Sequence, residues 1–289
     1  MMRNFFTIVF LLLTMSVGFA GESNVSEEAP QQFQGFNLQG YTDGGSKAWD
    51  VNGDTADILG NLIKLTNINA NMYGETPTNL TAKTGNIEKD SGKVHLEKDV
   101  VITSNAGDQM TTDSLDWHRT QDLITTKDFV TITNEKLQAT GTGMEAHPNL
   151  KIAQLNQDVT VHFHPEQQKP GEDQTVTITS DGPLEIDQVK NTAVFHDNVV
   201  AIQIGRELKA DIMEIFFDPS TKKIKKIVCT GHVEVTQGGN KSFSDKAVYS
   251  ADDQRLVLSG QPKLILMSSN GEGGKDQGLN IFGQLGNKK

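Results

Sequence analysis

One recurring phrase constrains the fold of this chain more than any other feature. Each copy is a polar turn, a short apolar strand, a Gly, Asp or Asn step, and a second β-branched strand. Two copies are clear and four are weaker: Asp90–Ile102, Arg119–Ile132, Leu150–Phe163, Thr192–Ile202, Ile224–Val235 and Leu256–Leu266. Their polar steps lie 29, 30, 40, 34 and 29 residues apart, measured at Asp99, Asp128, Asp158, Asn198, His232 and Gln261. Such a period predicts stacked copies of one supersecondary unit, each burying its apolar face on its neighbours.

The apolar residues alternate with polar ones at the period of a β-strand. Leu208, Ala210 and Ile212 are predicted to share one face, and Val233 and Val235 share a face of another strand. A sheet with one apolar face must pack that face on a second sheet or close on itself. We therefore predict an all-β fold, an elongated, open β-jelly-roll of stacked antiparallel hairpins in two successive modules.

The first twenty residues have the pattern of an export signal. Arg3 supplies the positive charge, Phe5–Met15 the apolar run, and Gly18–Ala20 a small-x-small cleavage site. The apolar run is short of the roughly 20 residues that span a bilayer. We expect a signal peptide at 1–20 that is cleaved after Ala20; an uncleaved membrane anchor is the alternative.

Composition divides the rest of the chain into four parts and a linker. Residues 21–35 are acidic and lack periodicity, which predicts a flexible leader. Residues 166–174 are rich in Gln, Glu, Gly and Pro and predict a linker between β modules at 36–165 and 175–267. Residues 268–289 are rich in Gly, Asn and Lys and predict a disordered tail.

Charge and cysteine content narrow the class of partner. The net charge of −11 argues against a nucleic acid or an anionic membrane held by general electrostatics. Cys229 is the only cysteine, so an exported chain of this size folds without disulfides. It follows Ile227 and Val228, and we expect it to be a small buried residue rather than a reactive thiol.

No combination of residues predicts a catalytic centre or a cofactor. The sequence has no Gly-x-Ser-x-Gly elbow, no phosphate loop and no His-Glu-x-x-His motif. His162 and His164 are two apart on a predicted strand and therefore share a face, but the other five histidines are scattered. We expect the chain to have no enzyme activity, no metal and no cofactor.

A dense basic run stands out in this acidic chain. Four lysines lie within five residues, at Lys222, Lys223, Lys225 and Lys226. Two interpretations stay open: a solvated hairpin turn, or a local contact for phosphates on a glycolipid headgroup.

Several of these segments resemble the OstA-like proteins of lipopolysaccharide export, the LptC and LptA families. The second module carries the LptA-like segments Ser180–Asp187, Ala193–Ile202, Leu208–Asp211, Ser244–Tyr249 and Leu256–Gly260; the first carries the LptC-like segments Met110–Trp117 and Leu123–Thr126. LptC proteins usually have one module behind an uncleaved anchor. This chain instead joins an LptC-like module to an LptA-like module behind a segment that predicts cleavage, so its anchoring stays open.

The resemblance implies a periplasmic carrier that shields lipopolysaccharide acyl chains in an apolar groove between the inner and outer membranes. The implied partners are lipopolysaccharide, the inner-membrane ABC transporter of lipopolysaccharide export, and other OstA-like modules that pair through edge strands. Matched to LptA, the groove positions are Val176, Ile178, Val235 and Tyr249, and alternation adds Val199, Ala201, Leu208 and Ala210.

Two other functions suit a repetitive β-structure. A polysaccharide-active β-helix enzyme has coils of about 22 to 25 residues with Asn ladders and a charged catalytic cluster, which this sequence lacks. A closed structural or adhesive β-solenoid buries the same apolar residues as its core. A lipid-binding assay separates this last alternative from a carrier, because a closed core binds no lipid.

Overall fold

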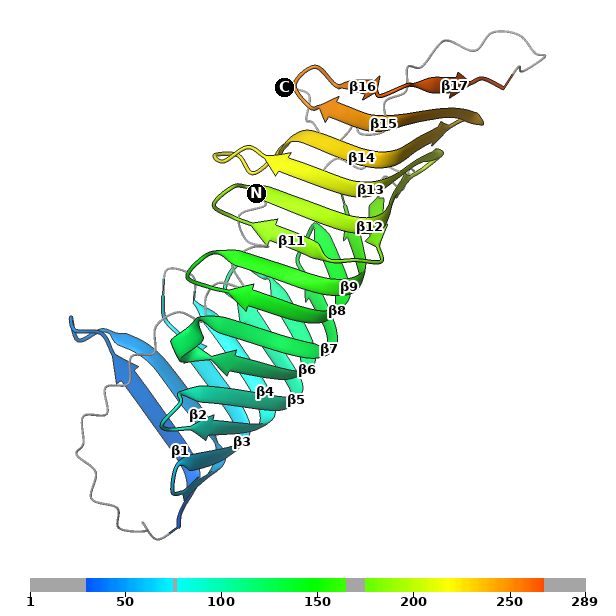
Figure 1. Cartoon of the computed structure of the whole chain (residues 1–289). Helices are drawn as coiled ribbons and strands as arrows, with labels where there is room; N and C mark the ends of the chain where they lie inside the picture. The colour runs from blue at the N-terminus through cyan, green and yellow to red at the C-terminus, as the bar shows by residue number, and fades with distance from the viewer. Residues whose placement is uncertain (1–29, 75–76, 165–174, 268–289) are drawn as a thin grey trace. The chain divides into compact units, whose positions relative to one another are not determined.

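The computed structural model describes residues 30–74, 77–164 and 175–267, and these are built almost entirely of β-strands (Figure 1). They hold no α-helix and one short 3-10 helix, η1 (Arg119–Gln121). The strands are β1 (Gln31–Tyr41), β2 (Lys47–Leu59), β3 (Leu62–Met72), β4 (Thr78–Glu88), β5 (Lys93–Ser104), β6 (Gln109–His118), β7 (Leu123–Thr133), β8 (Leu137–His147), β9 (Ile152–Phe163), β10 (Val176–Ser180), β11 (Leu184–Asp187), β12 (Thr192–Gln203), β13 (Arg206–Phe217), β14 (Ile224–Gln237), β15 (Asn240–Ser250), β16 (Arg255–Ser259) and β17 (Lys263–Ile265). The predicted all-β class is confirmed.

The expected boundaries compare with the structure as follows. The signal segment 1–20, the linker 166–174 and the tail 268–289 lie outside the described residues. The first strand begins at Gln31, so the expected leader at 21–35 extends too far by five residues. The apolar residues Phe33 and Phe36 belong to this strand and pair with β2, which explains the earlier start.

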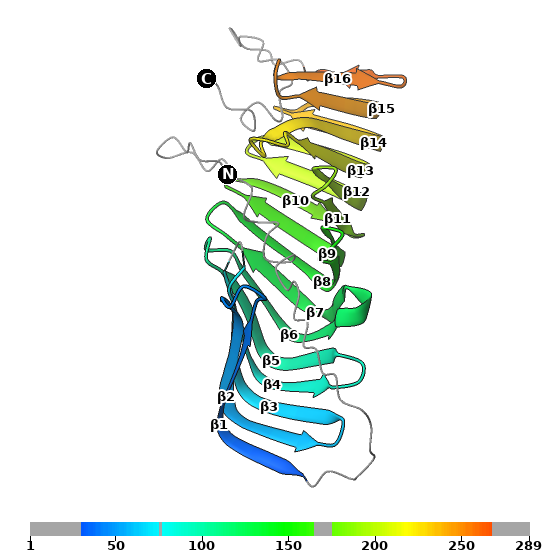
Figure 2. The same ribbon diagram turned by 90° about the vertical axis from the view of Figure 1, so that its left-hand side faces the viewer.

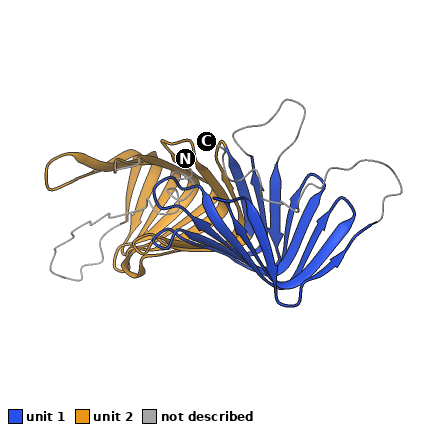
Figure 3. Ribbon diagram, turned by 90° about the horizontal axis from the view of Figure 1, so that it is seen from above, with its two compact units in different colours: residues 1–3, 136–141, 154–289 blue, residues 4–135, 142–153 orange. Residues whose placement is uncertain are grey.

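The chain forms two compact units (Figure 3). Unit 2 contains residues 4–135 and 142–153, and unit 1 contains 1–3, 136–141 and 154–289. Within unit 1, β9 and β10 pair across the expected linker, with Val176 opposite Phe163. The expected linker therefore joins two hydrogen-bonded strands of one unit, and the division into modules at 36–165 and 175–267 stays a prediction.

Most strands pair with the next strand along the chain, always antiparallel. Figure 2 shows β1 to β6 of unit 2 lying side by side in chain order, and each strand from β1 to β6 pairs with the next one along the chain. Unit 1 continues the same way from β12 to β16. These are the stacked hairpins that the sequence period predicts.

In five of the six copies the polar step lies inside one strand, and only Gln261, between β16 and β17, lies in a gap between two strands. Five of the six steps have a positive φ, namely Asp99, Asp158, Asn198, His232 and Gln261. The strand registers shift around most of these positions, as in a β-bulge. A bulge bends its strand and increases the local twist. Figure 3 shows the strands of unit 1 spreading from such a bend into two arms.

A glycine is required at one of these bends. Gly231 has φ +77° and precedes His232. A Cβ added to Gly231 would lie 2.0 Å from Oδ2 of Asp211, whose carboxylate bonds the His232 ring at 2.9 Å. Only the absence of a side chain lets the two strands approach so closely.

The bends divide unit 1 into a first arm and a second arm. The first arm comprises residues 184–187, 192–196, 212–217, 224–230, 246–250 and 255–259. The second arm comprises residues 159–163, 176–180, 199–203, 206–210, 233–237, 240–244 and 263–265. Backbone hydrogen bonds run along each arm, from strand to strand.

Candidate functional site

The structure gathers seven of the eight predicted groove residues on the second arm of unit 1. One row of directly opposed residues crosses four strands and contains Ile178, Ala201, Leu208 and Val235. In the row on one side of it, Val199 lies opposite Ala210. In the row on its other side, Val176 lies opposite Phe163. Alternation within a strand and register between strands therefore bring these side chains to one face.

Tyr249 lies on the first arm, apart from the other seven. It is opposite Ile227, which is opposite Ile215. Burial, together with the nearby Asp253 carboxylate, raises the pKa of the Tyr249 hydroxyl to about 12. The Tyr249 side chain is therefore neutral and belongs to the apolar face of the first arm.

All eight predicted residues are buried, with exposed fractions between 0% and 7%. The residues at the bends, such as Asp197, Asp211 and Asp245, are exposed. Polar residues thus mark the outside of each bend, and the apolar faces of both arms are turned inward. In this structure the eight predicted residues are as buried as the core residues of a folded protein.

Sequence alternation placed one residue on the wrong face. Ile212 was expected to share a face with Leu208 and Ala210, but it lies at the bend and is 37% exposed. The bulge inserts an extra residue, so the inward face continues at Met213, which is fully buried.

The first arm contributes apolar residues that sequence reasoning did not assign to the site. They are Phe195, Met213, Ile215, Ile227 and Cys229, all 5% exposed or less. Burial raises the pKa of the Cys229 thiol to about 12, so this cysteine is an inert apolar residue as expected. Alternation alone, restarted after each bend, would have found this set.

The apolar rows become exposed at the terminal strands. In unit 1, Leu264 of β17 lies opposite Ser242 and is 54% exposed. In unit 2, Leu38 of β1 lies opposite Val51 and is 48% exposed. The inward face is thus accessible at the edge strands, which also carry unpaired backbone groups.

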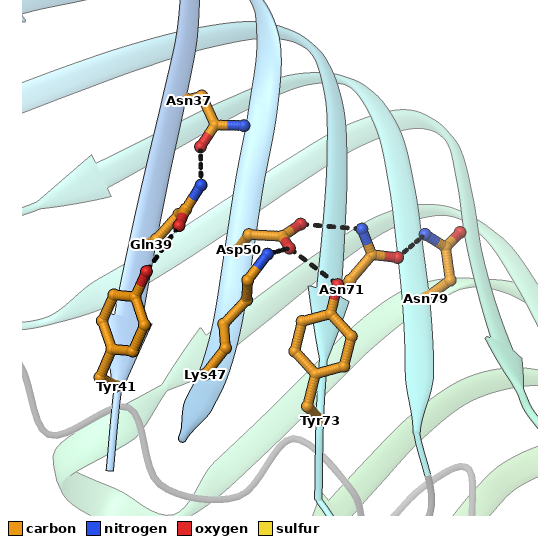
Figure 4. Close-up of polar contacts among 8 residues, drawn as sticks. All are labelled: Asn37, Gln39, Tyr41, Lys47, Asp50, Asn71, Tyr73 and Asn79. Atoms are coloured by element: carbon orange, nitrogen blue, oxygen red, sulfur yellow. Dashed lines mark hydrogen bonds and ion pairs between the residues drawn. The ribbon is translucent and has the colours of Figure 1, made fainter. Parts of the chain in front are cut away.

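A polar network on β2 to β4 of unit 2 was not predicted (Figure 4). Asp50 accepts hydrogen bonds from Lys47 Nζ at 2.9 Å, Asn71 Nδ2 at 2.9 Å and the Tyr73 hydroxyl at 2.8 Å. These bonds, first of all that from Asn71, lower the pKa of the Asp50 carboxyl to about 2. Asn79 extends the network by donating to Asn71 at 2.8 Å. A carboxylate held ionised by three donors links β2 to the end of β3 and is a structural feature of unit 2.

The two histidines weighed as metal ligands have other partners. His162 Nδ1 lies 3.0 Å from the Thr177 hydroxyl, and His164 Nδ1 lies 3.0 Å from the Thr175 hydroxyl. Within the described ranges, no group of three or more His, Cys, Asp or Glu side chains is placed to hold a metal ion.

The basic run lies at the hairpin between β13 and β14. Lys222 Nζ donates to the Asn191 amide oxygen at 2.5 Å, and Lys226 Nζ lies 4.4 Å from the centre of the Phe216 ring. Asp218 accepts from the Thr221 backbone amide at 2.7 Å, which closes the turn. Two of the four lysines therefore contact neighbouring side chains, as in an ordinary hairpin turn; a phosphate contact stays a prediction.

The fold and the buried apolar rows define an all-β protein whose candidate ligand surface is apolar rather than catalytic. Residues 6–164 match the family model for lipopolysaccharide-assembly, LptC-related proteins. This match covers more than half of the chain, and the chain belongs to the LptC-related family. Residues 177–277 match the model of the LptA and LptD N-terminal domain, described as a lipopolysaccharide transport protein.

The two matches stand in tandem, so an LptC-like region is followed by an LptA-like region in one chain, as the resemblance implied. Comparison with individually curated proteins gave no match. Proteins of these families act in lipopolysaccharide transport at the cell envelope and are not enzymes. No helix in the described part of the chain is long and apolar enough to cross a membrane.

Proposed function

We propose that this protein is a periplasmic lipopolysaccharide carrier that holds acyl chains between the two arms of unit 1. The observation that carries the proposal is the row from Ile178 to Val235, which is continuous across four strands and purely apolar. The same face becomes accessible at Leu264, on the last strand. The family assignment supports lipopolysaccharide as the cargo.

Such a carrier needs no chemistry of its own. Burying one methylene group contributes about 0.8 kcal/mol, so a chain of about a dozen carbons requires on the order of 10 kcal/mol to cross water unprotected. An apolar row with equivalent positions lets the chain move from strand to strand at nearly constant free energy. The direction of movement then comes from a pump elsewhere, for which the inner-membrane ABC transporter is the expected partner.

Entry of an acyl chain requires the arms to separate, because their inward faces are buried. Backbone hydrogen bonds join strands within each arm, so separating the arms breaks side-chain contacts and leaves the strand ladders intact. The lost apolar contacts are replaced by contacts with the acyl chain. The exchange is therefore nearly neutral in free energy.

The edge strands offer a means of joining similar proteins. β1 and β17 lie at the two ends of the chain's strand order and expose Phe33, Leu38, Leu264 and Ile265. An edge with apolar side chains and free backbone groups accepts a further strand from an OstA-like neighbour. Export by residues 1–20, or anchoring by them, is part of the same proposal.

Site-specific photo-crosslinking tests the carrier. A small diazirine-bearing residue at Leu208 or Val235, which face each other on the inward side, is expected to capture lipopolysaccharide in cells. The matched controls are Lys209 and Glu234, the next residues on the same strands, which face each other on the outward side. Circular dichroism verifies that each labelled protein has kept its β-structure. Equal labelling from both faces overturns the carrier.

A closed structural β-sandwich is the second candidate function. Burial of all eight predicted residues to 7% exposure or less favours it, because a permanent core has the same appearance. The crosslinking experiment separates the two functions, since a closed core captures no lipid from either face.

A further inference from the structure

Two neighbouring polar atoms on the inward face of the second arm of unit 1 have no hydrogen-bond partner among the described residues. The Ser242 hydroxyl and the Gln237 side-chain oxygen are buried, and neither has a hydrogen-bond partner within the described residues. Ser242 is only 2% exposed. A buried polar group without a partner is unfavourable and uncommon in native proteins, so such a pair indicates a site for a missing partner.

Strand register brings the two groups together beside the acyl-chain row. Ser242 lies directly opposite Val235, and Gln237 is two residues beyond Val235 on the same strand. Residues directly opposite each other, and residues two apart on a strand, project from one face. Val235 is in turn opposite Leu208. The polar pair therefore adjoins the apolar row at the hairpin end of the arm.

The chemistry of the pair selects one kind of ligand group. A serine hydroxyl both donates and accepts a hydrogen bond. A glutamine amide presents its oxygen or, after rotation by half a turn, its nitrogen, and so it accepts or donates. The group that satisfies both side chains in either orientation is one that itself donates and accepts. A hydroxyl does so from a single oxygen atom, whereas an ester, an ether or a plain methylene does not and an amide does so only through two separate atoms.

We propose that Ser242 and Gln237 bind a hydroxyl group carried on an acyl chain near its polar end. The inference rests on the proposed carrier function, because the remainder of the chain must lie along Val235 and Leu208. Ser242 is opposite the exposed Leu264, so the hydroxyl is held close to the accessible end of the row. The site gives the second arm a preference for hydroxylated over plain acyl chains.

The chain offers a matched control on the same strand. Ser244 is also buried and projects from the same face as Ser242, two residues away on β15. Its hydroxyl already donates to the Lys246 carbonyl oxygen at 3.1 Å. Removing this hydroxyl takes away a structural hydrogen bond and no ligand contact.

Binding of two fatty acids to the full chain tests the proposal. The probes are tetradecanoic acid and 3-hydroxytetradecanoic acid, each below its micelle concentration, measured by isothermal titration calorimetry. We expect the unaltered protein to prefer the hydroxylated acid by about tenfold, the worth of one or two net hydrogen bonds. Ser242→Ala and Gln237→Leu are expected to abolish the preference by weakening only the hydroxylated acid, and Ser244→Ala to keep it.

The outcomes separate this inference from the carrier function. If the unaltered protein binds both acids equally, or Ser242→Ala keeps the preference, the pair holds only water, and the hydroxyl site is wrong while the carrier stands. If neither acid binds, the carrier and the hydroxyl site are both overturned. Two substitutions on different strands guard against a folding defect in one, and binding of tetradecanoic acid reports that each variant is folded.

Discussion

The second arm of unit 1 and strands β1 to β7 of unit 2 each carry a row of directly opposed residues, and the two rows differ in their polar groups. In unit 2 one row of opposed residues crosses seven strands and is apolar throughout: Leu38, Val51, Ala70, Leu80, Ile102, Met110 and Ile132. In unit 1 the corresponding row contains Ser242 between Val235 and Leu264. The LptC-like region thus has an uninterrupted apolar row, and the LptA-like region has one that is interrupted near its end.

The buried serines of the two units show what the difference means. Ser104 of unit 2 donates to the Asp108 carboxylate at 3.1 Å and accepts from the Ala106 amide at 3.2 Å, so its hydroxyl is used to close a turn. Ser242 of unit 1 has no such bond. A buried serine is therefore a structural residue in one unit and a candidate ligand contact in the other, and only the hydrogen-bond partners distinguish them.

The strongest test of the comparison places a charge in each row. Val235→Asp in unit 1 and Ile102→Asp in unit 2 are each expected to lower the free energy of unfolding by about 3–5 kcal/mol, because each buries an unpaired carboxyl group. Urea unfolding measures the loss. The neighbouring Thr236→Asp and Thr103→Asp, which face outward, should change it little. An outward substitution as damaging as its inward neighbour would show that the row is not a core.

The polar network of unit 2 predicts a pH dependence that is centred on Asp50. Asp50 has a pKa of about 2 when folded, below its usual value, so it stabilises the protein above about pH 4 and loses this contribution as the pH falls from about 4 to about 2. The contribution at neutral pH is about 2 kcal/mol. The stability gap between the unaltered protein and Asp50→Asn should therefore close over this pH range.

Tyr73→Phe sharpens the same test, since it removes one of the three donors to Asp50 and keeps the carboxylate. The difference in stability between Tyr73→Phe and Asp50→Asn should be smaller than the difference between the unaltered protein and Asp50→Asn. It should also disappear at a higher pH. A gap that does not change with pH would mean that the network does not hold the carboxylate in its ionised form.

The smallest expected effects come from the paired serines of β15. Ser244→Ala removes a made hydrogen bond and should lower the free energy of unfolding by about 1 kcal/mol. Ser242→Ala removes an unpaired hydroxyl and should leave the stability unchanged or slightly higher. Urea titrations of the two variants side by side measure the difference. Equal losses would indicate that Ser242 has a structural bond after all.

Sequence alone predicted the class of fold and most of the inward face. Period-two alternation identifies Leu208, Ala210 and Val235, because it is a property of any strand with one buried side. It failed at Ile212, where the bulge changes which residues face inward. The bends were visible in the sequence as polar steps, but each step was expected to separate two short strands, and most of them lie inside one long strand.

The polar features required the structure. Asp50, Asn71 and Asn79 are far apart in the sequence and meet only because the hairpin lengths set the strand register. Ser242 and Ser244 look equivalent in the alternation, and the geometry of the bend decides that only Ser244 reaches a carbonyl oxygen. Register and bend geometry depend on the whole hairpin, which local patterns do not encode.

The bends within the long strands also determine how the arms lengthen when repeats are added. Because each of the strands β12 to β15 contributes one segment to each arm of unit 1, one added repeat of two such strands lengthens both arms together, by about 9–10 Å at the usual strand spacing. The cross-section between the arms stays the same. A fold of this kind can therefore gain or lose length by duplicating or deleting whole repeats, without redesigning the interior.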